Sequence, residues 1–193
     1  MIGLSVYLFV AITFCVILYL SFRFIEYVYC AFIIKQPTNV ASSKWMMREV
    51  VKQINTYYGN AKNICDIGSG FGFMARFVAR HTKANVIGLE NVRFSARVSD
   101  ILNLFYFGKV KTIRCDAYKY LEKTKKIFDV GIAYLGPKEV QKLKKYKQKM
   151  RVLICLDFEI HGLNPVRIID VGHGFTYFNH KKYPHKLFIY EFK

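Results

Sequence analysis

One stretch, NICDIGSGFGFMARFVARH from Asn63 to His81, constrains the fold more than any other part of the chain. A short apolar run leads into glycines at three alternate positions, Gly68, Gly70 and Gly72, and apolar residues at helical spacing follow. Glycine accepts positive φ and lets a ligand approach the backbone, and amides at a helix start can meet a polar or anionic group. The stretch therefore predicts a strand, a turn and a helix, and the turn is a candidate ligand loop.

Strand-like and helix-like patterns alternate along the rest of the chain from about Pro37. Apolar residues at helical spacing predict three further helices. The first has Met47, Val50, Val51 and Ile54 on one face and an N-cap at Ser42 or Ser43. The second is marked by Phe94, Val98, Ile101, Leu102 and Phe105, and the third by Val140, Leu143, Tyr146 and Met150. Apolar runs predict strands over residues 63–68, 84–90, 109–116, 127–135, 150–158, 166–172 and 185–192. Strands separated by helices are typical of a buried parallel sheet, and only the last two strands lack room for a long helix between them. The predicted fold class is α/β, a Rossmann-like, doubly wound, mostly parallel seven-stranded sheet with a terminal antiparallel hairpin.

The first 22 residues carry no charged side chain. As a helix they would span about 33 Å, enough to cross the hydrocarbon core of a bilayer. A cleaved signal peptide would show a basic start, a shorter apolar core and a small-residue cleavage site, and a buried core helix would rarely run this long without a charge. We therefore predict an N-terminal transmembrane helix with residues 2–22 in the lipid bilayer. Residues 1–35 would form the anchor and an interfacial segment, and residues 36–193 a single domain.

Basic residues follow this apolar segment and none precedes it, beginning with Arg23, Lys35 and Lys44. The positive-inside rule therefore predicts a single-pass membrane protein with its domain on the cytoplasmic side of a bacterial inner membrane or an organelle membrane.

Positive charge is concentrated in the domain. The formal net charge is +17, and residues 1–35 hold only one unit of it, since Glu26 offsets one of Arg23 and Lys35. Ten cations lie between Lys123 and Arg151, against two acids. Beside an anchor, this surface predicts attraction to an anionic membrane surface, at about 1 kcal/mol per nearby cation. Nucleic acid is the alternative partner, and a solvated basic face is the third possibility.

The cysteines and histidines show no metal-ligand spacing, so we expect no metal site. Cys65, Cys115 and Cys155 each lie inside an apolar, strand-like run. This placement is typical of small buried side chains in a reducing compartment.

Two carboxylates end the next predicted strands after the glycine turn. Glu90 can accept both hydrogen bonds of a ribose diol, and Asp116 can accept one from an adenine amino group. A dinucleotide motif G-x-G-x-x-G fails at Phe73, and no lysine follows the glycines as it does in a P-loop. Each acid alone favours a helix cap or a surface position, but the glycine turn and both acids together favour an adenosine-containing ligand.

The segments DIGSGFG, VIGLE, TIRCDA and FDVGIAYL resemble the motifs of class I, seven-strand S-adenosylmethionine-dependent methyltransferases. The resemblance covers residues 60–158 and implies S-adenosyl-L-methionine as the cofactor. It implies the following site residues: Asp66, Gly68, Ser69, Gly70 and Gly72 around the methionine part, Glu90 and Asn91 at the ribose, Cys115, Asp116 and Ala117 at the adenine, and Tyr134, Leu135, Gly136 and Pro137 lining the acceptor site.

A narrower resemblance, carried by the apolar leader, the segment QPTNVASSKWMMREVV and the turn AYLGP, is to small membrane-associated protein-lysine methyltransferases related to the mitochondrial ATP synthase c-subunit lysine methyltransferase. This chain departs from that group at Phe71 and Phe73, where those proteins carry an acidic residue and an arginine. It also has Asn91 and Val92 after Glu90, where they have an Asn-Pro step.

Three classes of function follow from the sequence. The first is a membrane-anchored methyltransferase that N-methylates a lysine of a membrane or membrane-proximal protein. The second is a methyltransferase of RNA or a small molecule, although the chain lacks the Asn/Asp-Pro-Pro-Tyr turn that amide- and adenine-amino methyltransferases share. The third is a non-catalytic membrane-bound module that binds the cofactor or a partner.

Overall fold

The computed structural model describes residues 2–28, 42–106, 108–176 and 179–192. The chain divides into two compact units, Met1–Val40 and Ala41–Lys193. The boundary that we predicted at residue 35 lies outside the described residues.

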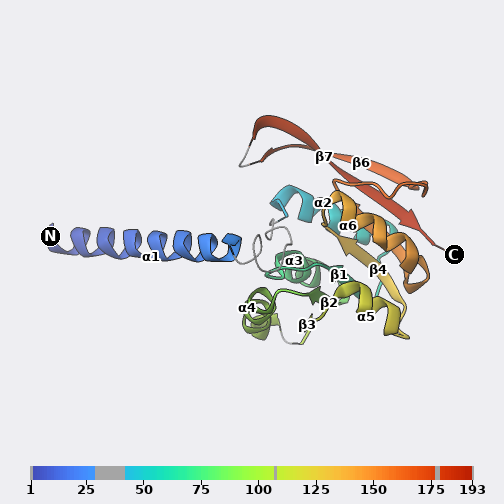
Figure 1. Ribbon diagram of the computed structural model, residues 1–193, viewed down its shortest axis with the longest axis horizontal. Coiled ribbons are helices and arrows are strands. Elements are labelled where there is room, and N and C mark those ends of the chain that lie inside the picture. The colour runs from blue at the N-terminus through green and yellow to red at the C-terminus, as the bar shows by residue number, and fades with distance from the viewer. Residues whose placement is uncertain (1, 29–41, 107, 177–178, 193) are drawn as a thin grey trace. The chain divides into compact units, whose positions relative to one another are not determined.

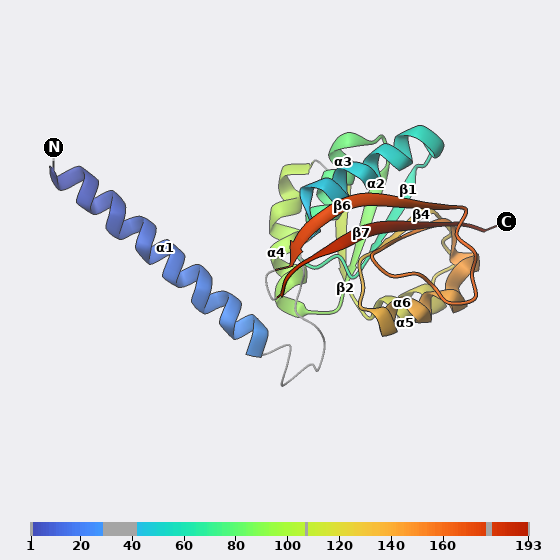
Figure 2. The same ribbon diagram turned by 90° about the horizontal axis from the view of Figure 1, so that it is seen from above.

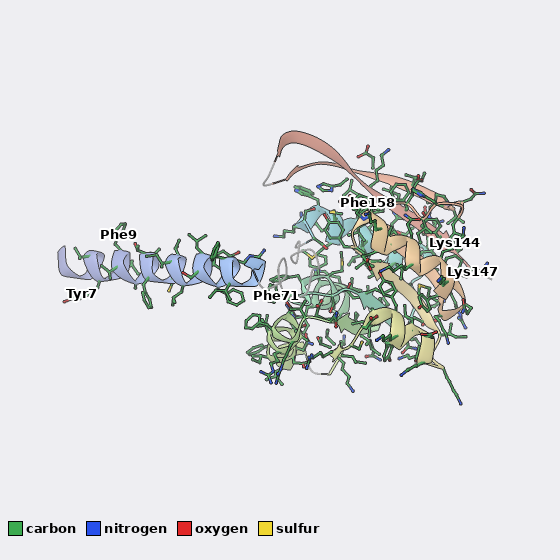
Figure 3. The ribbon with its side chains drawn as sticks, in the orientation of Figure 1. Tyr7, Phe9, Phe71, Lys144, Lys147 and Phe158 are labelled. Carbon is green, nitrogen blue, oxygen red and sulfur yellow. The ribbon has the colours of Figure 1, made fainter. Side chains whose placement is uncertain are left out.

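The described residues of the first unit form the helix α1 (Ile2–Val28), so the first residues of the predicted interfacial segment, up to Val28, continue the apolar helix. Within it, Val6–Ile25 has a mean hydropathy of 2.3 and is long and apolar enough to cross a membrane. Tyr7 and Phe9 project from this helix (Figure 3), with 76% and 72% of their surfaces exposed. Length and composition alone identify this span, and a signal sequence would share both.

The second unit is built on a seven-stranded sheet in the order β3-β2-β1-β4-β5-β7-β6. The strands are β1 (Asn63–Ile67), β2 (Asn85–Glu90), β3 (Val110–Arg114), β4 (Phe128–Ala133), β5 (Met150–Leu156), β6 (Arg167–Thr176) and β7 (Asn179–Glu191). The first five strands are parallel, and β7 runs antiparallel between β5 and β6. The predicted α/β sheet and its terminal hairpin are confirmed.

Helices cover both faces of the sheet (Figures 1 and 2). They are α2 (Lys44–Tyr57), α3 (Phe73–His81), α4 (Arg93–Asn103), α5 (Ala117–Lys123) and α6 (Pro137–Gln141), with 3₁₀ turns η2 (Leu104–Tyr106) and η3 (Lys142–Lys149). Buried apolar residues of α2 and α3 pack in one core cluster, while those of α5, α6 and η3 pack in the other. Because the strand sides alternate, each face of the sheet has its own core.

Helix α2 matches its prediction closely. Ser43 is its N-cap, and the Ser43 hydroxyl accepts a hydrogen bond of 3.2 Å from the backbone N–H of Met46. Val50 and Ile54 are fully buried.

Helix α4 has a different buried face from the one that its apolar spacing indicates. Ile101 is 62% exposed, and in the following turn Phe105 is 74% exposed. The buried positions are the small or polar Ser95, Ala96, Ser99 and Asn103. These residues pack close to the sheet and meet a buried arginine, a requirement that apolar periodicity cannot register.

The lysine-rich segment before β5 also differs from the predicted α-helix. Only Pro137–Gln141 is α-helical, and Lys142–Lys149 forms 3₁₀ turns with non-helical backbone angles at Tyr146. Val140 and Leu143 are buried as predicted, whereas Met150 begins β5.

Candidate functional site

The glycine turn leaves β1 at the point where the strand order reverses, between β1 and β4. Ligands of open α/β sheets bind at such points, outside the carboxyl ends of the strands. Gly68, Gly70 and Gly72 have φ angles of 74°, 55° and 76°, in the left-handed region that favours glycine. The N–H groups of Gly68 and Ser69 both donate to the carbonyl oxygen of Leu89, at 2.9 and 3.0 Å, which ties the turn to β2.

Glu90 ends β2 and is 5% exposed. Its Oε2 accepts a hydrogen bond of 2.7 Å from the Gly70 N–H, and its Oε1 accepts one of 2.7 Å from the Val92 N–H. The carboxylate therefore joins the glycine turn to the start of α4. Its position at the end of β2, beside the turn, is the one predicted for a carboxylate that contacts a ribose.

Asp66 lies in β1 just before the turn and is 4% exposed. Its carboxyl accepts a hydrogen bond from the backbone N–H of Ala75 in the first turn of α3, while burial, foremost, and the nearby Glu90 raise its pKa to about 7. Within the described residues, Oδ2 of Asp66 and Oγ of Ser69 are buried without a hydrogen-bond partner. These two atoms, one at the end of β1 and one on the turn that follows, are candidates for contact with a polar ligand.

The predicted adenine residues lie at the carboxyl end of β3. Asp116 is the N-cap of α5, where its Oδ1 accepts from the backbone N–H groups of Tyr118 and Lys119 at 2.9 and 3.2 Å. Cys115 and Ala117 flank it and are half-buried, and the Cys115 N–H donates to the Glu90 carbonyl at 2.9 Å. The cap thus fixes Asp116 next to β2. Asn91, in the loop after Glu90, is exposed.

The residues predicted to line the acceptor site follow β4. Leu135 packs against the turn, since a Cβ built on Gly68 would meet its Cδ2 at 2.6 Å. Gly136 is the N-cap position of α6, and Pro137 is its first residue. Tyr134 is half-buried, and its hydroxyl hydrogen-bonds the carboxylate of Asp157. Burial and that carboxylate raise the pKa of Tyr134 above its usual range.

Asp157 and His185 were not among the predicted site residues. Asp157 follows β5 with a φ of 65°, and Asp is one of the few residue types that tolerate this conformation. Its two oxygens lie 3.0 and 2.9 Å from Nδ1 of His185 on β7. Tyr134 and Asp157 directly follow β4 and β5, and His185 lies within the neighbouring strand β7, so the three side chains come together. The position of Asp157 directly after a predicted strand could have marked it as a candidate site residue. Nothing in the sequence indicates that it pairs with a histidine 28 residues later.

Arg76 is a second residue that sequence reasoning missed. It is 6% exposed, and its Nη2 donates to the carbonyl oxygen of Phe71 in the glycine turn at 2.6 Å. Its Nη1 donates to Asn103 Oδ1 at 3.2 Å, and Asn103 Nδ2 in turn donates to Thr112 Oγ1 at 2.9 Å. The network supports the turn from behind, and burial lowers the pKa of the Arg76 guanidinium.

The cysteines agree in part with their predicted burial. Cys65 and Cys155 are fully buried, and Cys115 is half-buried. No group of three or more metal-ligating side chains occurs in the described part of the chain.

Neither the known protein families nor the curated proteins give a match to this sequence. Solved structures do. An RNA methyltransferase from Salinibacter ruber, in complex with S-adenosyl-L-homocysteine, superimposes with a TM-score of 0.62 and 17% identity over 79% of this chain and 93% of that one. A putative RNA methyltransferase from Pyrococcus horikoshii gives 0.61 and 12% identity over 78% and 89%. TrmK of M. capricolum, also with S-adenosyl-homocysteine, gives 0.56 and 15% identity over 78% and 69%.

These similarities establish the fold. The second unit has the seven-stranded α/β fold of S-adenosylmethionine-dependent methyltransferases. The resemblance of its motifs to that class is therefore confirmed at the level of the fold. The similarity to lysine methyltransferases of the ATP synthase c-subunit type remains a hypothesis.

Proposed function

We propose that the protein is a membrane-anchored, S-adenosylmethionine-dependent methyltransferase. One observation carries the proposal: the buried Oδ2 of Asp66 lacks a hydrogen-bond donor in the described structure, at the turn where three left-handed glycines leave the strand. An uncompensated buried carboxylate is costly. The cationic amino group of an S-adenosylmethionine molecule would compensate it.

The other residues of the site fit the same ligand. Ser69 Oγ offers a second buried polar atom without a partner. Glu90 stands at the end of β2, beside the turn, for the ribose hydroxyl groups, and Asp116 stands at the end of the adjacent strand for the adenine. Along β1, β2 and β3 in that order, the site therefore offers a contact for the cationic amino group, one for the ribose diol and one for the adenine base.

S-adenosylmethionine supplies a methyl group already activated on a sulfonium, so the protein mainly has to align a nucleophile and remove its proton. Leu135 packs on the glycine turn at Gly68. The preceding residue, Tyr134, hydrogen-bonds Asp157, which in turn pairs with His185. We assign His185 as the proton acceptor, because Nδ1 faces Asp157 and Nε2 can take a proton from the incoming amine.

The acceptor that we propose is a lysine of a membrane or membrane-proximal protein. The apolar helix Val6–Ile25 supports this location. A lysine must lose its proton before it attacks, and a half-buried site with a histidine–carboxylate pair favours that loss. Methylation of RNA is the second candidate, because two of the similar structures are described as RNA methyltransferases and the domain is strongly basic.

Calorimetric titration of the detergent-solubilised full chain with S-adenosylmethionine tests the proposal, with NAD as the control ligand. We expect selective micromolar binding that Glu90→Gln weakens at least about tenfold, because the carboxylate loses a ribose contact. Absence of binding to folded protein would refute the proposal.

Labelled-methyl transfer then separates the acceptors. Incubation with membrane fractions should label a protein band whose label survives ribonuclease, whereas label in RNA would favour the second candidate. Binding without any transfer would leave a non-catalytic cofactor-binding module.

A further inference from the structure

A basic cavity of about 420 Å³ lies between α2 and α3. Its lining residues are Lys44, Met47, Arg48, Phe73, Arg76, Phe77, Arg80, His81 and Tyr106. Five of these nine side chains are basic or imidazole groups, and the lining contains no acid. A concave site of one charge sign concentrates counter-ions, so this cavity is suited to an anion.

Three cations of the cavity have no acidic partner. Lys44, Arg48 and Arg80 are exposed, and none forms an ion pair with any residue in the described ranges. Arg48 instead lies over the ring of Trp45, 5.4 Å from its centroid. Arg76 is committed to the network behind the turn, and its guanidinium is not needed for the anion.

Exposed apolar side chains are neighbours in the sequence of the residues that line the cavity, and we call them its apolar rim. Trp45 is 69% exposed beside Lys44, and Phe73 is 49% exposed at the start of α3. Leu104 and Phe105, which directly precede the lining residue Tyr106, are 77% and 74% exposed. Tryptophan and phenylalanine next to lysine and arginine are typical of surfaces that enter the headgroup region of a membrane. Aliphatic side chains such as Leu104 offer no stacking surface to the bases of a nucleic acid.

The cavity residue Lys44 lies close in the sequence to the end of α1. Fifteen residues separate Val28, the end of α1, from Lys44, the start of α2. Such a tether reaches at most about 55 Å. We propose that the cavity binds the phosphate of an anionic phospholipid, with Lys44, Arg48 and Arg80 as its ligands and the apolar rim inserted among the headgroups. This inference rests on the membrane anchorage proposed above.

The lysine-rich surface of α6 and η3 is the competing membrane contact. It belongs to the opposite face of the sheet, as the two core clusters show, and Lys144 and Lys147 lie on it (Figure 3). Some of its cations already have acceptors: Lys142 pairs with Glu139 at 2.8 Å, and the Lys149 ammonium donates to the Thr124 carbonyl at 2.6 Å. Because Lys44, Arg48 and Arg80 have no such ion pair in the described ranges, the cavity between α2 and α3 is the better site.

Fluorescence of Trp45, the only tryptophan of the chain, reports directly on this surface. The full chain is inserted into lipid nanodiscs of brominated phosphatidylcholine, with or without one part in about three of phosphatidylglycerol. We expect phosphatidylglycerol to increase the quenching of Trp45 at least about twofold, because each cation near an anionic surface adds to its attraction. Arg48→Gln/Arg80→Gln should return the quenching to the value in phosphatidylcholine alone.

The matched control removes two charges from the opposite face. Lys145→Gln/Lys147→Gln should keep the full effect of phosphatidylglycerol, and Arg48→Lys/Arg80→Lys should keep most of it. The proposal is overturned if the control pair abolishes the effect or if phosphatidylglycerol has none. It is also overturned if inorganic phosphate or single-stranded RNA, added to neutral discs, changes Trp45 emission more than phosphatidylglycerol does. Co-elution of the protein with the discs reports the anchor separately, so failure of α1 to insert is distinguishable.

Discussion

At the scale of single residues, Asp66 shows how the fold can bury a carboxyl group and leave one of its oxygens without a hydrogen-bond donor. Its carboxyl is buried between β1 and α3, where the Ala75 N–H stabilises the ionised form and burial opposes it more strongly. The result is an acid with a pKa of about 7 and an oxygen without a donor. A cation that reaches this oxygen gains an interaction that water cannot supply in the unliganded site.

The raised pKa gives a stability prediction for Asp66→Asn. The unfolded chain releases the Asp66 proton near pH 4, while the folded protein holds it to about pH 7. Between these values the folded state binds more protons, so the free energy of unfolding falls as pH rises, by up to about 4 kcal/mol. Urea unfolding at several pH values should show this fall in the parent protein and a weaker pH dependence in Asp66→Asn. If the free energy of unfolding depended on pH equally in both proteins, the pKa of Asp66 would be the same in the folded and unfolded states.

Cofactor affinity should change with pH in the opposite sense. A cationic amino group prefers ionised Asp66, so the affinity for S-adenosylmethionine should rise between about pH 5.5 and about pH 7. Titration calorimetry across this range checks the slope, and Asp66→Asn should flatten it while lowering the affinity. An equal slope in both proteins would assign the dependence to another group.

His185→Gln separates catalysis from binding. We expect methyl transfer to fall by about a hundredfold or more, because the variant cannot accept the proton of the acceptor amine. S-adenosylmethionine affinity should stay within about twofold, since Asp157 and His185 lie beyond the glycine turn. The exposed His161→Gln is the matched control and should keep full activity. A parallel loss of affinity and rate would make His185 a cofactor-site residue instead.

At the scale of elements, local patterns succeed where apolar burial decides the structure. The strand after Lys62, helix α2 and its Ser43 cap follow directly from the order of apolar and polar residues. Helix α4 does not, because the side that packs on the sheet satisfies a buried arginine with Ser99 and Asn103. Its apolar residues are left for the surface, where Ile101 and Phe105 remain exposed.

Arg76→Met tests the weight of this network. Loss of the guanidinium leaves the Phe71 carbonyl and Asn103 Oδ1 without their donor, so we expect a destabilisation of about 2–4 kcal/mol. Urea unfolding measures it, and the exposed Arg80→Met on the same helix should cost less than about 0.5 kcal/mol. Equal effects of the two substitutions would show that the network carries little stability.

At the scale of the whole molecule, the chain pattern predicts the sheet but only part of the site. Alternating strands and helices predict the mostly parallel seven-stranded sheet and its terminal hairpin, which the structure contains. The glycine turn and Glu90 predict the ligand loop, because they belong to two successive strand–helix units. Asp157 and His185 meet only because β7 inserts between β5 and β6. A contact made by such late, distant pairing has no local signature in one sequence.

The two units should attach to membranes in two different ways. The full chain should resist extraction by high salt, since removal of an apolar helix from a bilayer is not a screened electrostatic step. Residues 36–193 alone have their own core and should fold, which circular dichroism checks. This domain should bind phosphatidylglycerol vesicles at low salt, dissociate at about 1 M salt, where the Debye length is about 3 Å, and ignore phosphatidylcholine vesicles. If the isolated domain stays bound at high salt, its exposed apolar rim rather than its charge holds it, and α1 is not the main attachment.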